Sequence, residues 1–476
     1  MSRPRILLIL TEFPPRIGGM QTHALALANH LHARGYPVEV LTYRANRHEE
    51  KNAAHTVDAH LPFPVHRILS RVGYWHNVDT ITARGREFKP DLIYCSTVFY
   101  GFISQELHVP VICRSVGNDI MRPWIVYPFR FAGKLAGHPL LERRLYDLFK
   151  RFNYPEWVEI LFHKHRYQLM VRSARLLNYV MANSRFTADL LRDIGLPGDR
   201  VGEVVGGVDA ARFACKSPER IRKKLRVELN LPQKCYLMTT ACRLVAKKGV
   251  DFLIPSFLEL RKRMPDAHLL IIGEGRHEKR YRRLARRLGL REHITFTGRI
   301  PQADIQKYYW ASNAFVLASR VQVNPGTGLR DAETMGRVLC EANAAGIPVI
   351  AARSGGIPSV IRHRKNGLLF EPDNLDDFIA QVVKLRKDAT LRKQMVKTGI
   401  SWAQKKFDWS VIVARHEDIM EKVLARAGGK RKPSKVTRIS KARKPRAART
   451  AKTTTARKTA GKTKVAARKK RKAATA

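Results

Sequence analysis

Two or three cations and a glycine follow a predicted strand in the second half of the chain. Arg243 comes directly after the apolar run at 236–241, and Lys247, Lys248 and Gly249 precede a predicted helix. An Arg offers a two-pronged donor and a Lys a point charge, so that together they match a diphosphate at the edge of a sheet. A solvated basic loop would have the same composition. Arg243 and Lys248 are therefore candidate phosphate ligands.

Two carboxylates, Glu333 and Glu341, lie further along the chain. At about 100° per helical residue, their side chains would point roughly 80° apart on one helix. They are therefore poorly placed as a paired acid and base, and we expect Glu333 in a loop and Glu341 on the helix that follows. Glu333 could accept hydrogen bonds from sugar hydroxyls and Glu341 from ribose hydroxyls, while the N–H groups of Met335 and Gly336 face phosphates. An ordinary charged helix is the alternative.

Gly18 and Gly19 lie between the first predicted strand and the first predicted helix. Without side chains, their backbone can approach an anion that also meets the N–H groups of the helix start. The stricter dinucleotide-binding pattern of three glycines is absent, and a tight turn without a ligand is the alternative.

The elements that must position these residues repeat one pattern in each half of the chain. Short apolar runs, typical of strands buried on both faces of a parallel sheet, alternate with helical spacing. We expect strands at 5–10, 38–41, 92–95, 109–113 and 177–182, and again at 236–241, 269–272, 294–296, 314–317 and 348–351. The predicted fold class is α/β, with two Rossmann-like doubly wound domains in series. Their boundary is expected at Gly206-Gly207-Val208-Asp209 and the charged stretch 217–226, and an amphipathic helix is expected at 409–427.

Composition supports two domains and an appendage. The chain has 476 residues, of which 44% are hydrophobic, and a formal net charge of +49. Residues 430–476 contribute 20 Lys and Arg and no Asp or Glu, which leaves +29 for the rest. This tail has too few apolar side chains to offset its ordering entropy, so we expect it to be disordered.

Cysteine usage and the start of the chain favour a cytoplasmic setting. The six Cys include no CxxC pair and no zinc-like spacing, which is typical of reduced thiols in a core. The first apolar run, 6–10, is too short for a signal peptide or a membrane span.

Taken together, the motifs resemble those of the GT4 family of glycosyltransferases. The resemblance runs from about residue 5 to 427 and rests on the order of Gly18-Gly19, Gly206-Gly207-Val208-Asp209, Arg243 with Lys248-Gly249, Gly273-Glu274-Gly275, Phe296-Thr297-Gly298, Glu333 to Glu341, and Gly355-Gly356-Ile357-Pro358. It implies the GT-B fold, two Rossmann-like domains that face each other across a cleft. Residues 1–205 would form the acceptor domain and 206–405 the nucleotide-sugar domain. Residues 406–427 would cross back onto the first domain, and 428–476 would be the disordered tail.

The resemblance also implies roles for individual residues. Arg243 and Lys248 would hold the phosphates, Glu341 the ribose and Glu333 the donor sugar, with Arg243 and Glu341 facing the cleft. The other donor-site residues that it implies are Gly18, Gly19, Gly273, Met335 and Gly336. No metal or other cofactor is expected, since the sequence has no DxD pair and the two cations can neutralise the leaving diphosphate.

Two positions depart from the family pattern. The family loop that usually reads His-Gly-x-Asp is Val116-Gly117-Asn118-Asp119 here, so the His that commonly touches the donor sugar is missing. We expect Asp119, Asn118 or Arg114 to take its place, and we assign Asp119 to the catalytic group with Glu333, Arg243 and Lys248. Met335 stands where relatives usually have Phe or Tyr, which is tolerable if the backbone N–H does the binding.

The reaction that the resemblance implies is transfer of a hexosyl unit to an acceptor hydroxyl with retention at the anomeric carbon. Its setting would be the synthesis of cell-surface polysaccharide, lipopolysaccharide or glycolipid. No nucleophile is evident, which favours a same-face displacement in which a diphosphate oxygen assists removal of the acceptor proton. His23 could assist as well, or it could simply pack within its helix.

The expected partners are a nucleotide-sugar donor and a glycan or lipid-linked acceptor. The segment 121–170, rich in aromatics and cations, suits an anionic leaflet at the inner face of the plasma membrane, or helices that bury those aromatics. The tail resembles histone H1-like tails, which bind DNA phosphates without reading sequence. Anionic lipid or acidic polysaccharide would attract it too, and a solvated extension needs no partner. The rival hypothesis is an architectural nucleic-acid-binding protein whose catalytic body has lapsed.

Overall fold

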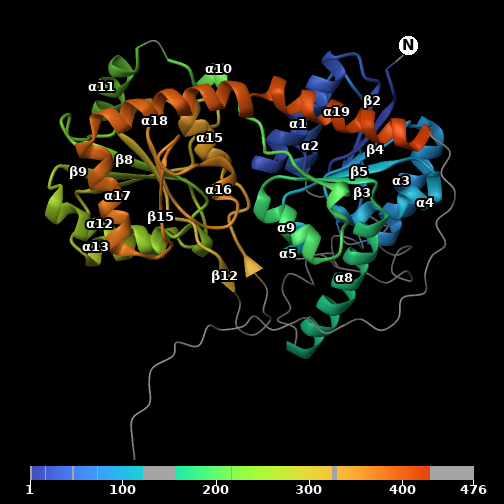
Figure 1. Ribbon diagram of the computed structural model, residues 1–476, viewed down its shortest axis with the longest axis horizontal. Coiled ribbons are helices and arrows are strands. Elements are labelled where there is room, and N and C mark those ends of the chain that lie inside the picture. Colours follow the sequence, from blue (N-terminus) through green and yellow to red (C-terminus); the bar gives the residue numbers. More distant parts are fainter. Residues whose placement is uncertain are drawn as a thin grey trace, which may run out of the picture. The chain divides into compact units, whose positions relative to one another are not determined.

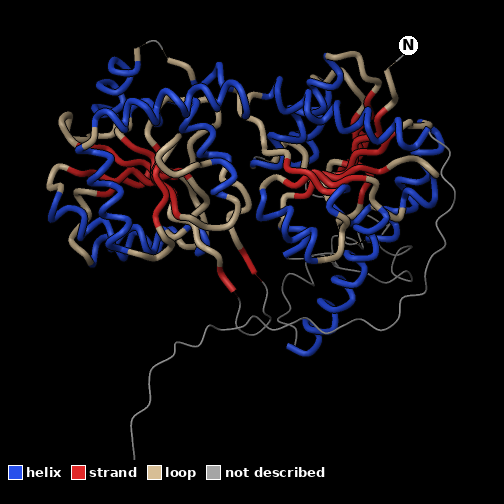
Figure 2. Tube along the Cα trace, viewed as in Figure 1, coloured by secondary structure: helices blue, strands red, loops and turns tan. Residues whose placement is uncertain are grey.

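Two parallel β-sheets flanked by helices make up the structure, which is a computed structural model (Figures 1 and 2). It describes residues 3–16, 18–45, 48–71, 73–121, 156–215, 217–323 and 330–428, with the backbone alone described for 156–162. All of these belong to one compact unit, Met1–Gly429. The predictions for the tail beyond residue 428, and those for most of the segment 121–170, fall outside the described residues.

The first sheet holds the first lobe together. Its strand order is β3-β2-β1-β4-β5-β6-β7, and every pair is parallel. Its central strands are buried on both faces because helices pack on each side. The strands are β1 (Ile6–Ile9), β2 (Val38–Tyr43), β3 (Val65–Leu69), β4 (Leu92–Cys95), β5 (Val111–Ser115), β6 (Tyr179–Ala182) and β7 (Val201–Glu203). The helices are α1 (Gly19–Ala33), α2 (His48–Ala59), α3 (Tyr74–Phe88), α4 (Ile103–Leu107), α5 (Asn118–Met121), α8 (Glu156–Leu176) and α9 (Arg185–Asp193).

The second sheet repeats this arrangement in the second lobe, with the order β10-β9-β8-β11-β14-β15. The strands are β8 (Tyr236–Ala241), β9 (Ala267–Ile272), β10 (Ile294–Gly298), β11 (Ala314–Leu317), β14 (Val349–Ala352) and β15 (Leu368–Phe370). The helices are α10 (Ala210–Phe213), α11 (Pro218–Glu228), α12 (Val250–Arg263), α13 (Glu278–Arg287), α14 (Ile305–Ala311), α15 (Arg337–Ala344), α16 (Ile357–Val360), α17 (Leu375–Lys387) and α18 (Ala389–Trp402). A small antiparallel pair, β12 (Gln322–Val323) and β13 (Arg330–Asp331), stands apart.

All ten predicted strands are present, with ends shifted by no more than a few residues. Sequence analysis missed β3, β7, β12, β13 and β15. β3, β7 and β15 are edge strands, and β7 and β15 have three residues each, too few to produce a periodic signal. The charged stretch 217–226 forms most of α11, which packs on α14 of the second lobe, and the domain bounds stay a prediction.

The last helix, α19 (Trp409–Gly428), contacts the first lobe although it follows the second (Figure 1). The Trp409 ring centroid lies 5.1 Å from that of His23 on α1, and Arg34, directly after α1, forms an ion pair with Glu417. Backbone pairing of Val208 with Asp408 brings the two chain segments that connect the lobes side by side. Within the described residues, no helix is long and apolar enough to span a bilayer.

Candidate active site

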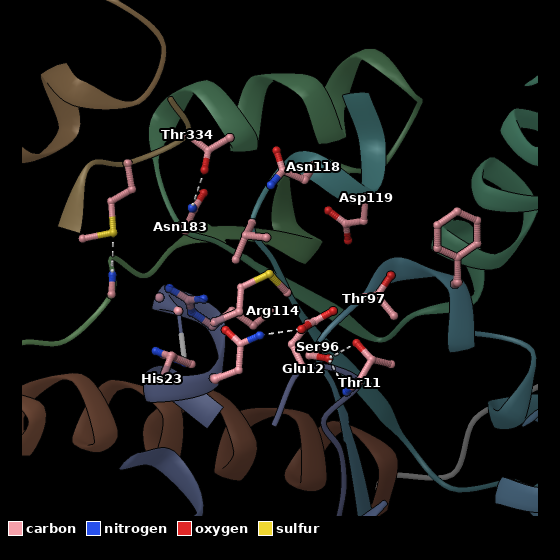
Figure 3. A pocket seen from close by; sticks show the side chains of 18 of the residues that line it. Thr11, Glu12, His23, Ser96, Thr97, Arg114, Asn118, Asp119, Asn183 and Thr334 are labelled. Atoms are coloured by element: carbon pink, nitrogen blue, oxygen red, sulfur yellow. Dashed lines mark hydrogen bonds between the residues drawn. The ribbon is translucent and has the colours of Figure 1, made fainter. Parts of the chain in front are cut away.

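A cavity of about 490 Å³ lies between the carboxyl ends of the two sheets (Figure 3). Loops that follow four strands of the first lobe contribute to it through Thr11, Ser96, Asn118 and Asn183. The second lobe contributes Arg243, after β8, and residues 333–337, which include the loop before α15 and the first residue of that helix. In doubly wound sheets, ligands bind at this carboxyl edge because the loops converge there and helix starts supply N–H donors. Position alone therefore makes this cavity the candidate active site.

Seven of the ten residues assigned from sequence line the cavity: Gly18, Gly19, Asp119, Arg243, Glu333, Met335 and Gly336. Lys248, Gly273 and Glu341 do not line it. As expected, Glu333 lies in a loop and Glu341 on the following helix, α15. The roles of the ten in binding and catalysis remain predictions.

Lys248 does not line the cavity, but it contacts Glu333, which does. The two side chains form an ion pair, and each is only 13% exposed. Burial opposes ionisation of Glu333, but the charge of Lys248 and its hydrogen bond outweigh burial and hold the pKa of Glu333 below its ordinary value. The second carboxylate oxygen of Glu333 accepts a hydrogen bond from the Gly336 N–H at 3.2 Å. A phosphate that accepted a hydrogen bond from this N–H would have to share it with Glu333.

Glu341 does not face the cavity, contrary to expectation. It is 4% exposed and accepts a hydrogen bond of 3.0 Å from the Tyr309 hydroxyl, while Arg337 Nε lies 3.3 Å from its other oxygen. Tyr309 and Arg337 hold the carboxylate within the second lobe. Arg337 itself lines the cavity and donates a hydrogen bond to the Gly19 carbonyl of the first lobe, at 3.3 Å.

Gly273 does not line the cavity but packs against the segment that precedes Arg243. Its φ is +124°, and a side chain there would meet the Cys242 carbonyl at 2.0 Å. Only glycine allows this close approach, which fixes the turn after β9 beside the residue that precedes Arg243.

Met335 joins the two lobes through its side chain. Its sulfur accepts a hydrogen bond from the Gly206 N–H at 3.1 Å, and the side chain is buried. Asn183 of the first lobe donates a hydrogen bond to the Thr334 hydroxyl at 3.1 Å (Figure 3). The loop before α15 is therefore fixed by the first lobe as well as by its own. Sequence analysis attributed no role to the Met335 side chain and did not identify Asn183 or Thr334.

The segment 116–119, which lacks the usual His, places Asp119 at the cavity. Both carboxylate oxygens of Asp119 already accept hydrogen bonds. One oxygen accepts a hydrogen bond from the Ser115 hydroxyl at 2.7 Å and the other from the Val98 N–H at 3.1 Å. Burial raises the pKa of Asp119, and these hydrogen bonds oppose the rise. Asp119 thus has a positional role in the described fold, and its catalytic assignment stays a prediction.

Arg114, the third candidate substitute for that His, is in an unusual state. Its side chain lines the cavity, is 6% exposed, and makes no hydrogen bond or ion pair in the described part of the chain. Burial lowers the pKa of its guanidinium, although Tyr94 and Cys113 oppose this. A buried cation without a partner is costly, and an anion or hydroxyl that enters the cavity would relieve the cost.

His23 is poorly suited to accept a proton. It lines the cavity, but both ring nitrogens are buried without a hydrogen-bond partner among the described residues. Burial, followed by the charges of Arg114, His416 and Arg337, lowers its pKa well below the ordinary value. Together with the Trp409 contact, this favours packing over proton transfer.

Glu12 is a further carboxylate at the cavity that sequence analysis did not identify. It follows β1 and accepts a hydrogen bond from Gln21 Nε2 at 2.5 Å. Burial raises its pKa, while Arg71 and Arg16 oppose the rise. Its place directly after the first buried strand, at the edge where ligands bind, was the available signal.

Metal binding is not indicated by clustering of side chains. In the ranges that the structure describes, no group of three or more His, Cys, Asp or Glu is arranged to hold an ion. Metal independence of the reaction remains a prediction.

Comparison with known proteins gives a consistent result for each lobe. A family model described as glycosyltransferase family 4 matches residues 17–212, and one described as glycosyl transferases group 1 matches residues 221–402. The chain is 26% identical over 426 residues to the GDP-mannose-dependent alpha-(1-6)-phosphatidylinositol monomannoside mannosyltransferase of Mycolicibacterium smegmatis, a match that covers 87% of this chain and 98% of the relative. The enzyme of the same name from Mycobacterium tuberculosis is 32% identical over 216 residues, which are 45% of this chain and 54% of that protein.

Solved structures support the fold. Sucrose-phosphate synthase from Thermosynechococcus elongatus aligns with a TM-score of 0.66 at 18% identity, over 89% of this chain and all of that one. HepE from Anabaena, in complex with UDP-glucose, aligns with a TM-score of 0.65 at 18% identity, over 88% of this chain and all of that one. The two α/β lobes have the GT-B fold. Since the two family models together span both lobes that form the cavity, the chain belongs to the family 4 (group 1) glycosyltransferases, enzymes that use nucleotide-sugar donors.

Proposed function

We propose that this glycosyltransferase transfers a hexose, with retention of configuration and without a metal ion, from a nucleotide sugar in the cavity to a hydroxyl of a lipid-linked or polysaccharide acceptor. The observation that carries the proposal is the convergence of Arg243, the Lys248–Glu333 pair and the start of α15 on one cavity, opposite Gly18 and Gly19. Cations and N–H groups on one side of a cleft suit a diphosphate leaving group, whose charge develops as the sugar departs.

We assign a role to each cavity residue from its exposure and its partners in the structure. The Arg243 side chain is exposed and forms no hydrogen bond or ion pair in the described ranges, so it can turn to a diphosphate at little cost. Glu333 would accept hydrogen bonds from the sugar while its negative charge is balanced by Lys248. Arg114 would meet the donor from the first lobe, at the place where the usual His is missing.

Retention is proposed to follow a same-face displacement. The diphosphate oxygen that leaves the anomeric carbon would take the acceptor proton, because both lie on the same face of the sugar. Glu333 is occupied by Lys248 and Gly336, and Asp119 by Ser115 and Val98, so neither is poised as a nucleophile.

The acceptor class and the location are supported by the relatives, which act on a phosphatidylinositol mannoside. We propose a lipid-linked acceptor and peripheral association with an anionic membrane at its cytoplasmic face. Association through the tail or the segment 121–170 is expected to weaken as salt rises, because it would depend on surface charge.

The test is ligand-induced stabilisation. The thermal unfolding temperature of the full chain is measured with GDP, UDP, ADP and their sugars, beginning with GDP-mannose. A ligand at 100 times its Kd should add about 2.7 kcal/mol to the free energy of unfolding. Arg243→Ala should remove this shift while the unliganded protein unfolds at an unchanged temperature. Stabilisation by no nucleotide, or an equal shift in Arg243→Ala, would refute the donor site.

The nucleic-acid-binding alternative is disfavoured by the family assignment. Removal of residues 430–476 separates the two hypotheses. The transferase hypothesis requires that the shortened chain still transfers sugar from its donor, whereas the alternative requires that neither form turns over any donor.

A further inference from the structure

A second cavity, of about 750 Å³, lies in the second lobe at the opposite edge of the same sheet from the candidate active site. Tyr236 is the first residue of β8, while Asn313 and Pro348 immediately precede β11 and β14. Arg243, in the active-site cavity, follows the other end of β8. Because β8 has six residues, the two cavities are separated by roughly 20 Å of strand. The second cavity is therefore a separate site.

Five cations surround this second cavity: Arg222 of α11, Arg386 of α17, and Arg392, Lys393 and Lys397 of α18. One of them is neutralised, since Arg386 forms a two-pronged pair with Asp266 at 2.5 and 2.9 Å. Within the described ranges, the Arg392 side chain donates only to the backbone carbonyls of Leu385 and Arg386. The charge of Arg392 is thus not balanced by a carboxylate.

The remaining three cations have no ion pair among the described residues. Lys393 and Lys397 are exposed and lie one helical turn apart, so their ammonium groups can reach the same ligand. Arg222 approaches from α11. Like charges held around one cavity repel each other. A multiply charged anion bound between them would attract each cation and offset this repulsion.

Two polar groups of the lining also lack partners. The Tyr236 hydroxyl and Arg222 Nε are buried and make no hydrogen bond within the described ranges. Burial raises the pKa of Tyr236 to about 12, so its hydroxyl keeps its proton and can donate it to an acceptor. Buried polar groups are usually satisfied, and these two are available to a bound molecule.

Apolar side chains complete the lining. Ile347, Pro348, Val396 and Ile400 lie among the cations. A concave site with apolar walls and a few convergent polar groups is typical of a discrete small ligand.

We propose that this cavity binds a soluble anion with two or more phosphate groups, at a site separate from the sugar-transfer site. Four cations without a carboxylate partner match the charge of such an anion, and spacing by one helical turn suits adjacent phosphates. The inference goes beyond the proposed transfer reaction and does not depend on it.

The test uses the full-length protein and inorganic tripolyphosphate. Lysine acylation, followed by mass spectrometry, measures the modification rate of each lysine with and without the anion, in about 0.3 M salt to screen the charged tail. Lys393 and Lys397 should be modified at least about fivefold more slowly when the anion is bound. Lys279, exposed on α13 outside the cavity, should be unaffected.

Variants locate the site through its affinity. The double variant Lys393→Ala, Lys397→Ala should bind tripolyphosphate at least about tenfold more weakly by calorimetry. A matched double variant, Lys279→Ala with Arg280→Ala, removes the same charge from α13 and should change affinity less than about twofold. Tyr236→Phe, which removes only the unpartnered hydroxyl, should weaken binding a few-fold. Two results would overturn the proposal: equal losses in the two double variants, or protection of Lys393 and Lys397 by phosphatidic acid vesicles but not by tripolyphosphate.

Discussion

The two sides of the active-site cavity differ in whether their buried charges are paired. On the second-lobe side, Lys247 is paired with Asp331, Lys248 with Glu333 and Arg337 with Glu341. On the first-lobe side, Arg114 is buried without a partner among the described residues, and the neutral His23 and His416 lie near it. A self-neutralised surface is stable without ligand, whereas an uncompensated cation stores a cost that a ligand can relieve. The second lobe is thus organised in advance, and the first lobe depends more on what binds.

The largest expected effect comes from breaking the second-lobe pair. Glu333→Gln leaves Lys248 buried without its counter-charge and removes a predicted contact to the donor sugar. We expect kcat to fall by about a hundredfold or more, and the free energy of unfolding to fall by about 3 kcal/mol. Steady-state kinetics and urea unfolding measure the two effects. Glu371→Gln, which breaks the exposed pair with Arg353, is the control and should change neither.

Arg114→Met should affect function and stability in opposite directions. It removes a buried charge that has no partner in the part of the chain that the structure describes, so the free energy of unfolding should rise by about 1 kcal/mol, while kcat/KM falls about tenfold or more. Arg114→Lys keeps the charge and should retain part of the activity without the gain in stability. If Arg114→Met proves less stable than the parent chain, the first-lobe side is not strained as described.

The pH dependence of stability distinguishes the sides. Burial lowers the pKa of His416 from 6.5 to about 4, although its hydrogen bond with the Ile412 carbonyl opposes this. The stability that this histidine contributes is complete above pH 6.5 and is lost as pH falls toward 4, since the unfolded chain takes up the proton first. Its share of the slope is at most about 1.4 kcal/mol per pH unit. The Lys248–Glu333 pair, with a lowered carboxyl pKa, begins to lose its contribution only below pH 4.5.

Urea unfolding at pH 7, 6 and 5 measures this slope. His416→Leu should flatten it, whatever its effect on stability at pH 7, while His60→Gln, an exposed histidine of the first lobe, should leave it unchanged. Identical slopes in the parent chain and His416→Leu would contradict the assignment. His268 of the second lobe also has a pKa lowered to about 4, chiefly by burial, so only the difference between variants reports on His416.

The smallest expected effect concerns the junction of the two sides. Thr334→Val removes the hydroxyl that accepts the Asn183 hydrogen bond and preserves its shape. We expect about 1 kcal/mol of lost contact energy, seen as a few-fold rise in KM for the donor with kcat nearly unchanged. A large fall in kcat instead would mean that Thr334 acts on the reacting groups.

The strands and the loop positions of the site could be predicted because they are local properties. Buried strands such as 236–241 and 314–317 are continuous apolar runs, and the structure places both with those bounds. The loop before α15 was predictable from Gly336, whose φ of +80° needs a glycine at the helix start. The edge strands β3, β7 and β15 were not, since β7 and β15 are very short and β3 is only partly buried, so that none of them forms a long continuous apolar run.

The sequence by itself determined the family, the two-sheet architecture and the edge at which the candidate residues gather, because these follow from hydrophobic periodicity and from short motifs. The tertiary structure alone decided which charges from distant segments are paired. The contacts of Lys248 with Glu333 and of Glu341 with Tyr309 join segments that are distant in sequence. Arg114, in contrast, is buried with no partner in the described chain. Ionisation and burial depend on three-dimensional neighbours, which no spacing of residues along the chain specifies.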